Sequence, residues 1–326
     1  MNLRALVTGG AGFIGSHVSE LLLGRGWTVD IIDDLSTGKR ENVPRDAKLV
    51  VADVASTEAA RIVGDGGYNV VVHLAAQMDV RRSVADPVFD AQVNVLGTLH
   101  LLEAIRRAGR GASSRIVFSS SGGAVYGDLA TPPSSETAAK EPDSPYGVAK
   151  LASEYYLGYY SRIHGLDSVS VRFGNVYGPR QDPHGEAGVV AIFCGRILRG
   201  DPLTIFGDGE QTRDYVYVDD VAEAIYAAAV GRIAPGGRID ERAFNVGTGV
   251  GTSVRTLAST LLEVSSTEAA IEFAPGRPGE QRHSSLSIDR AHTVLGWQPR
   301  VALRDGLRQT YSWFAARAAN ANHSLS

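Results

Sequence analysis

The chain has 326 residues, of which 44% are hydrophobic and 21% are charged, and its formal net charge is −4 at pH 7. This length allows one large domain or two of ordinary size, and the slightly acidic balance gives no electrostatic reason to expect nucleic acid or an anionic membrane as a partner. With a single cysteine, Cys194, no intramolecular disulfide can form, and no stretch approaches the ~20 apolar residues that span a bilayer, so we expect a cytoplasmic protein.

The first half of the chain alternates short apolar runs with segments of helical periodicity, the pattern of βαβ units and a parallel sheet. The expected strands cover 3–8, 29–32, 48–51, 70–74, 115–119 and 168–173. The first expected helix has Ile14, Val18, Leu21 and Leu22 on one face and is closed by Gly24 and Gly26, and two more cover about 92–107 and 146–164. The segment before the first glycine is too short for a signal peptide. Right-handed units of this kind build a doubly wound sheet that binds ligands beyond the carboxyl ends of its strands.

The composition of the chain changes after Asn175, where Gly and Pro become frequent and the expected helices become shorter. Two further apolar runs, 215–218 and 243–246, are candidates to rejoin the sheet. We therefore predict an α/β protein with a doubly wound parallel (Rossmann) sheet and a smaller, discontinuous C-terminal domain for the substrate. The first domain is expected to cover 1–175 and about 213–248, the second 176–212 and 249–318, and 319–326 is expected to be a disordered tail.

Glycines 9, 12 and 15 lie between the first strand and the first helix. Their missing side chains let the backbone approach a pyrophosphate, and the helix N-terminus contributes free N–H groups and a favourable dipole. Asp33, followed by Asp34, ends the next strand, near the position expected for a ribose-binding acid. A carboxylate there accepts both ribose hydroxyls and repels a 2′-phosphate, so NAD is favoured over NADP, although the charges of Lys39 and Arg40 lie nearby.

Asp53 and Val54 follow the third strand, a natural place for contacts with adenine. Asp53 is placed equally well to cap the N-terminus of the following helix. Both interpretations of Asp53 stay open at this point.

A serine run, 119–121, follows the strand at 115–119, so its hydroxyls lie at the edge of the sheet where ligands bind. Such a run is more often turn chemistry than catalysis. Tyr146 and Lys150, four residues apart on one helix, project from the same face. An ammonium close to a phenol stabilises the phenolate, so a tyrosine that titrates near pH ~10 can become a base nearer neutrality.

The chain resembles the extended short-chain dehydrogenase/reductase family. The resemblance rests on motifs that occur in the family's order, at 8–16, 73–76, Asn94, 144–150 and 207–220. Within that family the chain resembles the UDP-glucose (UDP-galactose) 4-epimerases, almost end to end. The resemblance implies a cofactor, NAD, and no metal. The residues that it and the motifs assign to the cofactor are Gly9, Gly12, Phe13, Ile14, Gly15, Asp33, Asp34, Asp53, Val54, Leu74, Ala75, Ala76, Gln77, Asn94, Ser119, Tyr146, Lys150 and Phe173.

The resemblance also implies roles in a reaction that inverts C4 of a UDP-hexose. Tyr146, as phenolate, removes the proton of the sugar 4-hydroxyl while hydride passes from C4 to NAD, and Lys150 lowers the pKa of Tyr146 and binds the nicotinamide ribose. The transient 4-keto sugar turns over, and hydride returns from bound NADH to its other face. A serine forms a hydrogen bond with the same 4-hydroxyl. The family pattern has two residues between that serine and the Val-Tyr-Gly at 125–127, but this chain has three, so we expect Ser121 to be the catalytic serine and leave Ser120 open.

In the second domain, the resemblance assigns Asn175, Arg213 and Arg277 to the diphosphate or sugar, although Arg213 could instead pair with Asp214 or Asp219. Phe206 is a candidate to stack on uracil, or alternatively a core residue. Serine at 284 leaves volume for an N-acetyl group near C2 of the sugar. The full set of expected substrate contacts is Ser121, Asn175, Val189, Phe206, Arg213, Arg277, Glu280 and Ser284.

Other activities remain open from the sequence. A 4,6-dehydratase needs an acid beside the catalytic serine, and residues 121–123 (Ser-Gly-Gly) carry none, whereas a UDP-glucuronate 4-epimerase or decarboxylase is harder to separate. A non-catalytic NAD-binding regulator is expected to have lost Tyr146 or Lys150, and both are present. Uridine and thymidine nucleotides are not distinguished. The resemblance further implies a homodimer built from the helices at 92–107 and 146–164.

Overall fold

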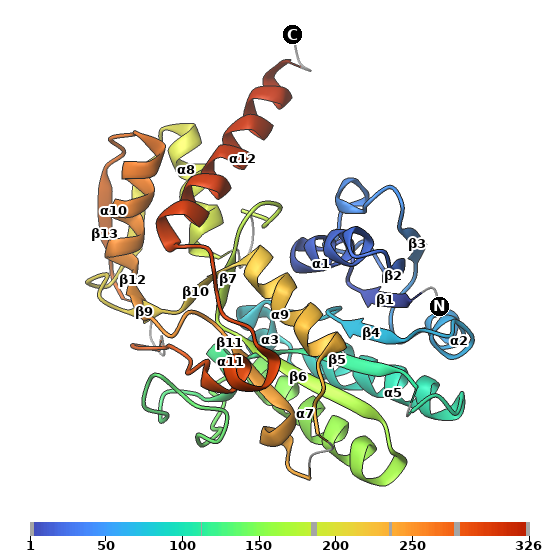
Figure 1. Cartoon of the computed structure of the whole chain (residues 1–326). Helices are drawn as coiled ribbons and strands as arrows, with labels where there is room; N and C mark the ends of the chain where they lie inside the picture. Colours follow the sequence, from blue (N-terminus) through green and yellow to red (C-terminus); the bar gives the residue numbers. More distant parts are fainter. Residues whose placement is uncertain (1–2, 112, 184–187, 235–236, 277–280, 324–326) are drawn as a thin grey trace.

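Seven parallel strands form the main sheet, in the order β11-β6-β5-β4-β1-β2-β3 (Figure 1). They are β1 (Arg4–Thr8), β2 (Thr28–Asp33), β3 (Lys48–Val51), β4 (Val70–His73), β5 (Arg115–Ser121), β6 (Asp167–Phe173) and β11 (Ala243–Val246). The computed structural model that gives this arrangement describes residues 3–111, 113–183, 188–234, 237–276 and 281–323. The predicted doubly wound parallel sheet is confirmed.

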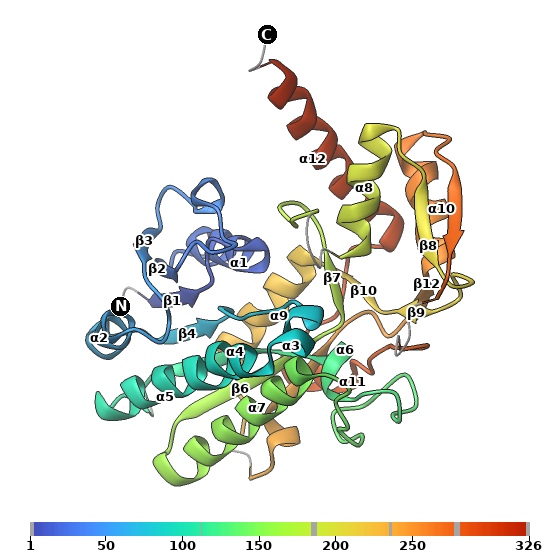
Figure 2. The ribbon, with the colours of Figure 1, turned by 180° about the vertical axis from the view of Figure 1, so that it is seen from behind.

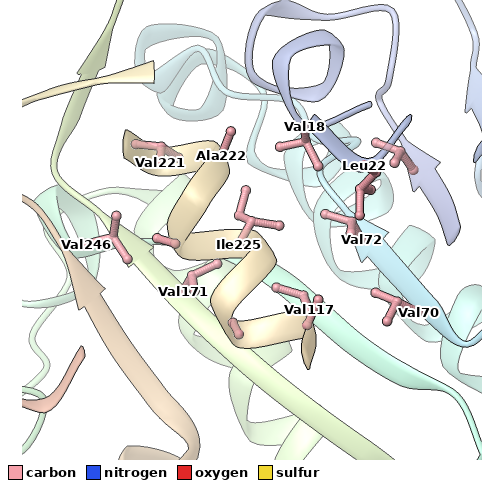
Figure 3. Close-up of a cluster of buried hydrophobic side chains, with 14 of the residues drawn as sticks. Val18, Leu22, Val70, Val72, Val117, Val171, Val221, Ala222, Ile225 and Val246 are labelled. Carbon is pink, nitrogen blue, oxygen red and sulfur yellow. The ribbon is translucent and has the colours of Figure 1, made fainter. Parts of the chain in front are cut away.

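One face of the sheet is covered by α1 (Phe13–Gly24), α9 (Val218–Val230) and α11 (Asp289–Leu295). Figure 3 shows Val221 and Ile225 of α9 lying over Val117 and Val171 of the sheet, with Val18 of α1 beside them. Alternate residues of a strand point to opposite faces, and each large apolar side chain buried here contributes about 1.5–3 kcal/mol. This packing fixes α1, and with it the turn at its N-terminus, against the sheet.

The opposite face carries α2 (Thr57–Asp65), α5 (Gly97–Arg107) and α7 (Pro145–His164), as Figure 2 shows. Two short helices, α3 (Val80–Ala85) and α4 (Pro87–Ala91), lie against α7. Leu6 and Ile116 of the strands pack here with Leu157 of α7. No helix among the described residues is both long and apolar enough to cross a membrane.

A second core lies beside the sheet and draws on segments from the C-terminal half (Figure 1). Its elements are α8 (Val189–Arg199), β8 (Leu203–Phe206), α10 (Val254–Ser265), β13 (Ile271–Ala274) and α12 (Leu303–His323). Short strand pairs connect it to the sheet region: β7 (Asn175–Tyr177) with β10 (Tyr215–Tyr217), and β9 (Thr212–Arg213) with β12 (Thr252–Ser253). The remaining short elements are η1 (Arg40–Asn42), η2 (Gln92–Leu96), α6 (Gly122–Val125) and η3 (Ile239–Arg242). The predicted domain boundaries stay a prediction.

Two expectations about the C-terminal half are wrong. The run at 215–218 does not rejoin the main sheet, because β11 occupies the position beside β6 and β10 pairs with β7 instead. The tail is not disordered from 319 onward, because α12 continues to His323. Alanine, the strongest helix former, occupies 315, 316, 318 and 319 and sustains this last part of α12.

Candidate active site

The glycine turn at 9–15 is packed so closely that side chains would not fit. Gly9 has φ +72°, and a Cβ built on it would lie 2.8 Å from Ala75 N. A Cβ on Gly15 would lie 2.1 Å from Gly9 O. Gly12 is the N-cap of α1, and no side chain of the described residues caps the helix there. The amide groups of this helix start are therefore available to an anion, which the helix dipole also favours.

Asp33 ends β2 beside this turn and is buried. Its Oδ2 accepts a hydrogen bond from Ala11 N at 2.9 Å, and its Oδ1 accepts one from Leu35 N at 2.9 Å. Burial raises the pKa of Asp33, and the two backbone bonds oppose that shift. Asp34, in contrast, is exposed and accepts a bond from Ser36 N. Of the two acids, Asp33 is the one that the fold fixes against the glycine turn.

Asp53 does not cap a helix, so this alternative is wrong. The N-cap of α2 is Ser56, whose Oγ accepts a bond from Ala59 N at 3.1 Å. Asp53 is exposed and accepts a bond from Ala55 N in a local turn. Its predicted contact with adenine stays a prediction, as does that of Val54.

The loop after β4 is held by a chain of buried hydrogen bonds. Leu74 N and Ala75 N each donate to Thr8 Oγ1 at 3.2 Å, and this hydroxyl lies 2.8 Å from His73 Nδ1. On the other side of the ring, Nε2 lies 3.1 Å from Thr98 Oγ1. Burial, with a smaller contribution from the charge of Lys150, lowers the pKa of His73 to about 3. The imidazole is therefore neutral and ties β1 to β4 and α5.

Asn94 clamps the same loop from η2, a π-helical turn at the start of the expected helix. Its Oδ1 accepts from Gln77 N at 3.0 Å, and its Nδ2 donates to Gln77 O at 2.9 Å and to Asp90 Oδ1 at 3.0 Å. Its backbone oxygen accepts from Ser153 Oγ of α7. Single π turns are frequent at functional sites, and this one joins the loop after β4, which includes Ala76, to α7.

Tyr146 and Lys150 lie in the first two turns of α7, at the carboxyl end of β5. Ser144 caps the helix by accepting from Gly147 N at 3.1 Å, and Tyr146 N donates to Ser83 Oγ at 3.3 Å. Lys150 is 3% exposed, and its Nζ donates to Ser119 O at 2.9 Å. The same nitrogen lies 5.7 Å from the centre of the Tyr146 ring. The pair is therefore a local cluster at the sheet edge.

The surroundings shift both groups toward their neutral forms. Burial lowers the pKa of Lys150 to about 8, against the opposing charges of Asp90 and Glu154. Tyr146 keeps part of its surface, yet desolvation raises the pKa of its phenol, and the charge of Asp90 adds to that rise. The expected lowering of the pKa of Tyr146 is not a property of the protein side chains alone.

The three serines differ in their environments. Ser119 donates to His73 O at 3.0 Å, and Ser120 is buried with an Oγ that has no hydrogen-bond partner in the described structure. Ser121, partly exposed, is the last residue of β5. A Cβ built on Gly123 would lie 4.0 Å from Ser121 Oγ and 3.9 Å from Asn175 Oδ1. The fold thus brings Ser121 and Asn175 to the same space.

The residues that follow the serine run, 122–125, form the short helix α6. A Cβ on Gly122 would lie 2.6 Å from Leu286 Cδ1, so this position packs against the C-terminal half. Phe173, expected at the cofactor, ends β6 and is buried in the core beneath α9.

Arg213 lies on β9 and donates to Thr212 O at 2.8 Å. The two acids weighed as its alternative partners bond elsewhere. Asp214 accepts from the backbone amides of Thr248, Gly249 and Leu286, and Asp219 Oδ1 lies 2.8 Å from His17 Nδ1. These bonds leave the assignment of Arg213, to the substrate or to one of these acids, a prediction.

The other expected substrate residues surround this strand or lie outside the described residues. Ser284 is buried, and its amide donates to Thr212 O at 3.2 Å, next to Arg213. Phe206 ends β8 and Val189 begins α8, and both are partly buried. Arg277 and Glu280 lie outside the described residues.

Comparison with known proteins gives consistent matches. The model of the NAD dependent epimerase/dehydratase family matches residues 5–247. A UDP-glucose 4-epimerase of Mycolicibacterium smegmatis is 47% identical over 317 residues, covering 96% of this chain and 98% of the relative. A solved UDP-glucose 4-epimerase of Thermotoga maritima with UDP-glucose has a TM-score of 0.91 and 43% identity, covering 97% of this chain and 100% of that one. The UDP-glucose 4-epimerase of Thermus thermophilus in complex with NAD has a TM-score of 0.87 and 45% identity, covering 96% of this chain and 99% of that one.

Proposed function

Because the chain belongs to the NAD dependent epimerase/dehydratase family, we propose that it is an NAD-dependent UDP-hexose 4-epimerase. It inverts C4 of UDP-glucose and UDP-galactose with no net redox change. The observation that carries the proposal is the placement of the glycine turn, after β1, and the Tyr146–Lys150 pair, after β5, at one edge of the sheet. We also infer a cytoplasmic location, as expected from the composition.

The described residues fit NAD. The turn at 9–15 leaves no room for side chains, the start of α1 offers uncapped amides to a pyrophosphate, and Asp33 suits the adenine ribose. When bound, NAD supplies a hydride acceptor, and its positive nicotinamide ring favours the phenolate of Tyr146. Lys150 would hold the nicotinamide ribose.

In the proposed reaction Tyr146 takes the proton of the 4-hydroxyl and later returns it. Ser121 holds the same hydroxyl, and Asn175, which faces the space beside it, contacts the sugar or diphosphate. Lys150, as an ammonium, favours the ionised form of Tyr146. Arg213 and Arg277 suit the diphosphate because guanidinium groups bond phosphate in a bidentate manner. Glu280 is proposed for the uridine ribose, with Phe206 and Val189 near the base.

A 4,6-dehydratase is disfavoured by the residues after β5. Elimination of water needs a carboxylic acid beside the serine, and here Gly122 packs on Leu286 while Gly123 borders the space between Ser121 and Asn175. Neither glycine supplies that acid, and at Gly122 a larger side chain would have to displace Leu286.

We further propose that Ser284 lets the enzyme accept UDP-N-acetylglucosamine. Ser284 lies beside Thr212 and Arg213, and its small side chain leaves room near the sugar where a large aromatic would fill it.

The enzyme is proposed to be a homodimer. Along α7, Val148, Tyr155, Tyr159 and Ile163 form an apolar row at spacings of seven, four and four residues, between 43% and 63% exposed. This row lies opposite the buried face of α7, and α5 runs beside it (Figure 2). Contiguous apolar surface of this kind marks a protein contact.

The test is conversion of UDP-galactose by the purified protein without added NAD. Proton NMR of the anomeric signals should show UDP-glucose appearing until both sugars are present at equilibrium, because the cofactor is regenerated in each turnover. Parallel reactions with UDP-glucuronate, UDP-N-acetylglucosamine and TDP-glucose define the substrate range. Absence of any 4-epimer from protein that carries stoichiometric NAD would overturn the proposal.

A further inference from the structure

A buried acid lies behind the Tyr146–Lys150 pair and has no role in the reaction as described above. Asp90, on the short helix α4, is 1% exposed. Its Oδ1 accepts hydrogen bonds from Gln77 Nε2 and Asn94 Nδ2, each at 3.0 Å. Its Oδ2 is buried and has no hydrogen-bond partner in the described structure.

A purely structural role does not account for this side chain. An asparagine would offer the same oxygen to Gln77 and Asn94, without the cost of removing a charge from water. A buried carboxylate oxygen that lacks a donor is also costly. The placement is understandable if the negative charge itself acts on a neighbouring positive group.

Lys150 is that positive group. Helix α4 packs against α7, and Asp90 and Glu154 are the two acids whose charges oppose the effect of burial on Lys150. The Glu154 carboxylate is already bonded to Arg172, at distances down to 2.5 Å. On the sheet side, His73 is close enough for the charge of Lys150 to lower its pKa and is a neutral ring, and Ser119 contributes its carbonyl oxygen. Asp90 thus supplies the negative charge near the pair that no cation neutralises within the described residues.

We propose that Asp90 is a positioning residue whose charge sets the pH range in which the Tyr146–Lys150 pair works. Through Gln77 and Asn94, the same carboxylate holds the loop after β4 against the cofactor side of the sheet edge. This inference rests on the roles proposed above for Tyr146 and Lys150. The charge keeps Lys150 as an ammonium and opposes premature ionisation of Tyr146.

The test compares Asp90→Asn with the wild type and with Asp86→Asn. Asp86 is exposed on the same segment and caps α4, a role that asparagine can also fill. Initial rates of UDP-galactose conversion are measured across pH. Loss of the Asp90 charge should move both limbs of the profile of kcat to lower pH by about one unit, the size expected for one charge in a partly polar interior. Asp86→Asn should leave the profile in place.

A profile of Asp90→Asn that keeps its position, whatever the absolute rate, overturns the role of the charge. NAD content after gel filtration tests the clamp separately. Asp90→Leu, which removes both acceptor bonds, should lose bound NAD, whereas Asp90→Asn should retain it; equal retention in both overturns the clamp. Failure of the proposed function is distinguishable, because the wild type itself would then form no 4-epimer.

Discussion

The immediate surroundings of Tyr146 work against its proposed role until the cofactor arrives. Desolvation and Asp90 raise the pKa of its phenol, and burial lowers the pKa of Lys150 to about 8. In the protein without a cofactor, Tyr146 is therefore a neutral phenol rather than a base. Bound NAD would supply a positive nicotinamide ring, whose charge would favour the phenolate of Tyr146. Proton removal is thereby tied to the presence of a hydride acceptor.

Replacement of Tyr146 by Phe removes one hydroxyl and should lower kcat by about 10²–10⁴-fold, the usual contribution of a positioned base. NAD content and thermal stability should stay near those of the wild type, because the ring and its backbone bond to Ser83 remain. The matched control is Tyr155→Phe, an exposed tyrosine on the same helix. Full turnover by the Tyr146 variant would exclude this residue as the base.

The pKa of Lys150 gives the wild-type enzyme an expected alkaline limit. As pH rises through about 8, the ammonium loses its proton and no longer favours the ionised phenol. Initial rates should therefore fall on the alkaline side, reversibly and without unfolding. Circular dichroism at each pH separates this titration from denaturation. A rate that stays constant far above this pH would show that the charge of Lys150 is not needed.

Ser284→Tyr tests the substrate range at a single position. The aromatic ring should fill the space beside the sugar, abolish conversion of UDP-N-acetylglucosamine and leave that of UDP-galactose within a few-fold of the wild type. Ser287→Tyr, at a serine on the same loop whose hydroxyl bonds Asp289, controls for a general effect of bulk. Equal loss on both substrates in the Ser284 variant would count against the proposed role.

Site residues that belong to a sequence motif could be predicted from the sequence. Site residues that depend only on tertiary contacts could not. The glycine turn, Asp33 and the Tyr146–Lys150 spacing follow from local geometry that the sequence displays. The role of Asp90 does not follow from the sequence, because the sequence does not show whether an acid so close to Asp86 is buried or exposed to solvent. Its burial depends on α4 packing against α7.

At the scale of the element, α7 is fixed by a buried ion pair one turn beyond the Tyr146–Lys150 pair. Arg172 of β6 is fully buried and bonds both oxygens of Glu154, together with Tyr126 Oη and Glu136 O. These bonds connect the helix, the sheet and the loop after α6. They hold the turn of α7 that follows Lys150 against β6.

Arg172→Met should lower the free energy of unfolding by about 3–5 kcal/mol, because it leaves the Glu154 carboxylate buried and unpaired. Adding Glu154→Leu should recover much of that loss, since two apolar groups replace the pair. Chemical denaturation measures both variants. Arg304→Met breaks an exposed ion pair with Glu263 and should change stability little. A single Arg172 variant as stable as the wild type would contradict the assigned role of the network.

Several expected elements match the structure closely, both where a strand is buried throughout, as at 243–246, and where it is partly exposed, as at 48–51. The strands at 48–51 and 243–246 and the long helix at 146–164 are confirmed, α7 beginning one residue earlier, at Pro145. The π turn at 92–96 was not predicted, because it follows from bonds that Asn94 makes to the loop after β4 and to α7. The partner of β10 was also not predicted, because the pairing of strands far apart in the sequence depends on tertiary packing that local patterns do not show.

At the scale of the molecule, the exposed apolar row on α7 predicts association. The purified protein should elute with a mass near twice its 34.6 kDa in multi-angle light scattering. Tyr159→Glu with Ile163→Glu should give a monomer, because two charges would be buried in the contact. Val294→Glu, at an exposed valine on α11, should not. A monomeric wild type at micromolar concentration would refute the proposed homodimer.

The pairing of β11 with β6 has a consequence for biosynthesis. Ala243 pairs with Ser170, and between them the chain leaves the sheet to form α8 and β8 of the second core. While the ribosome adds those residues, the outer edge of β6 presents unpaired amides and carbonyls, a template for contacts with other nascent chains. Closing so long a loop is slow compared with local helix formation. We therefore expect the half of the chain that carries the glycine turn and the catalytic pair to need chaperone protection until Val246 has emerged.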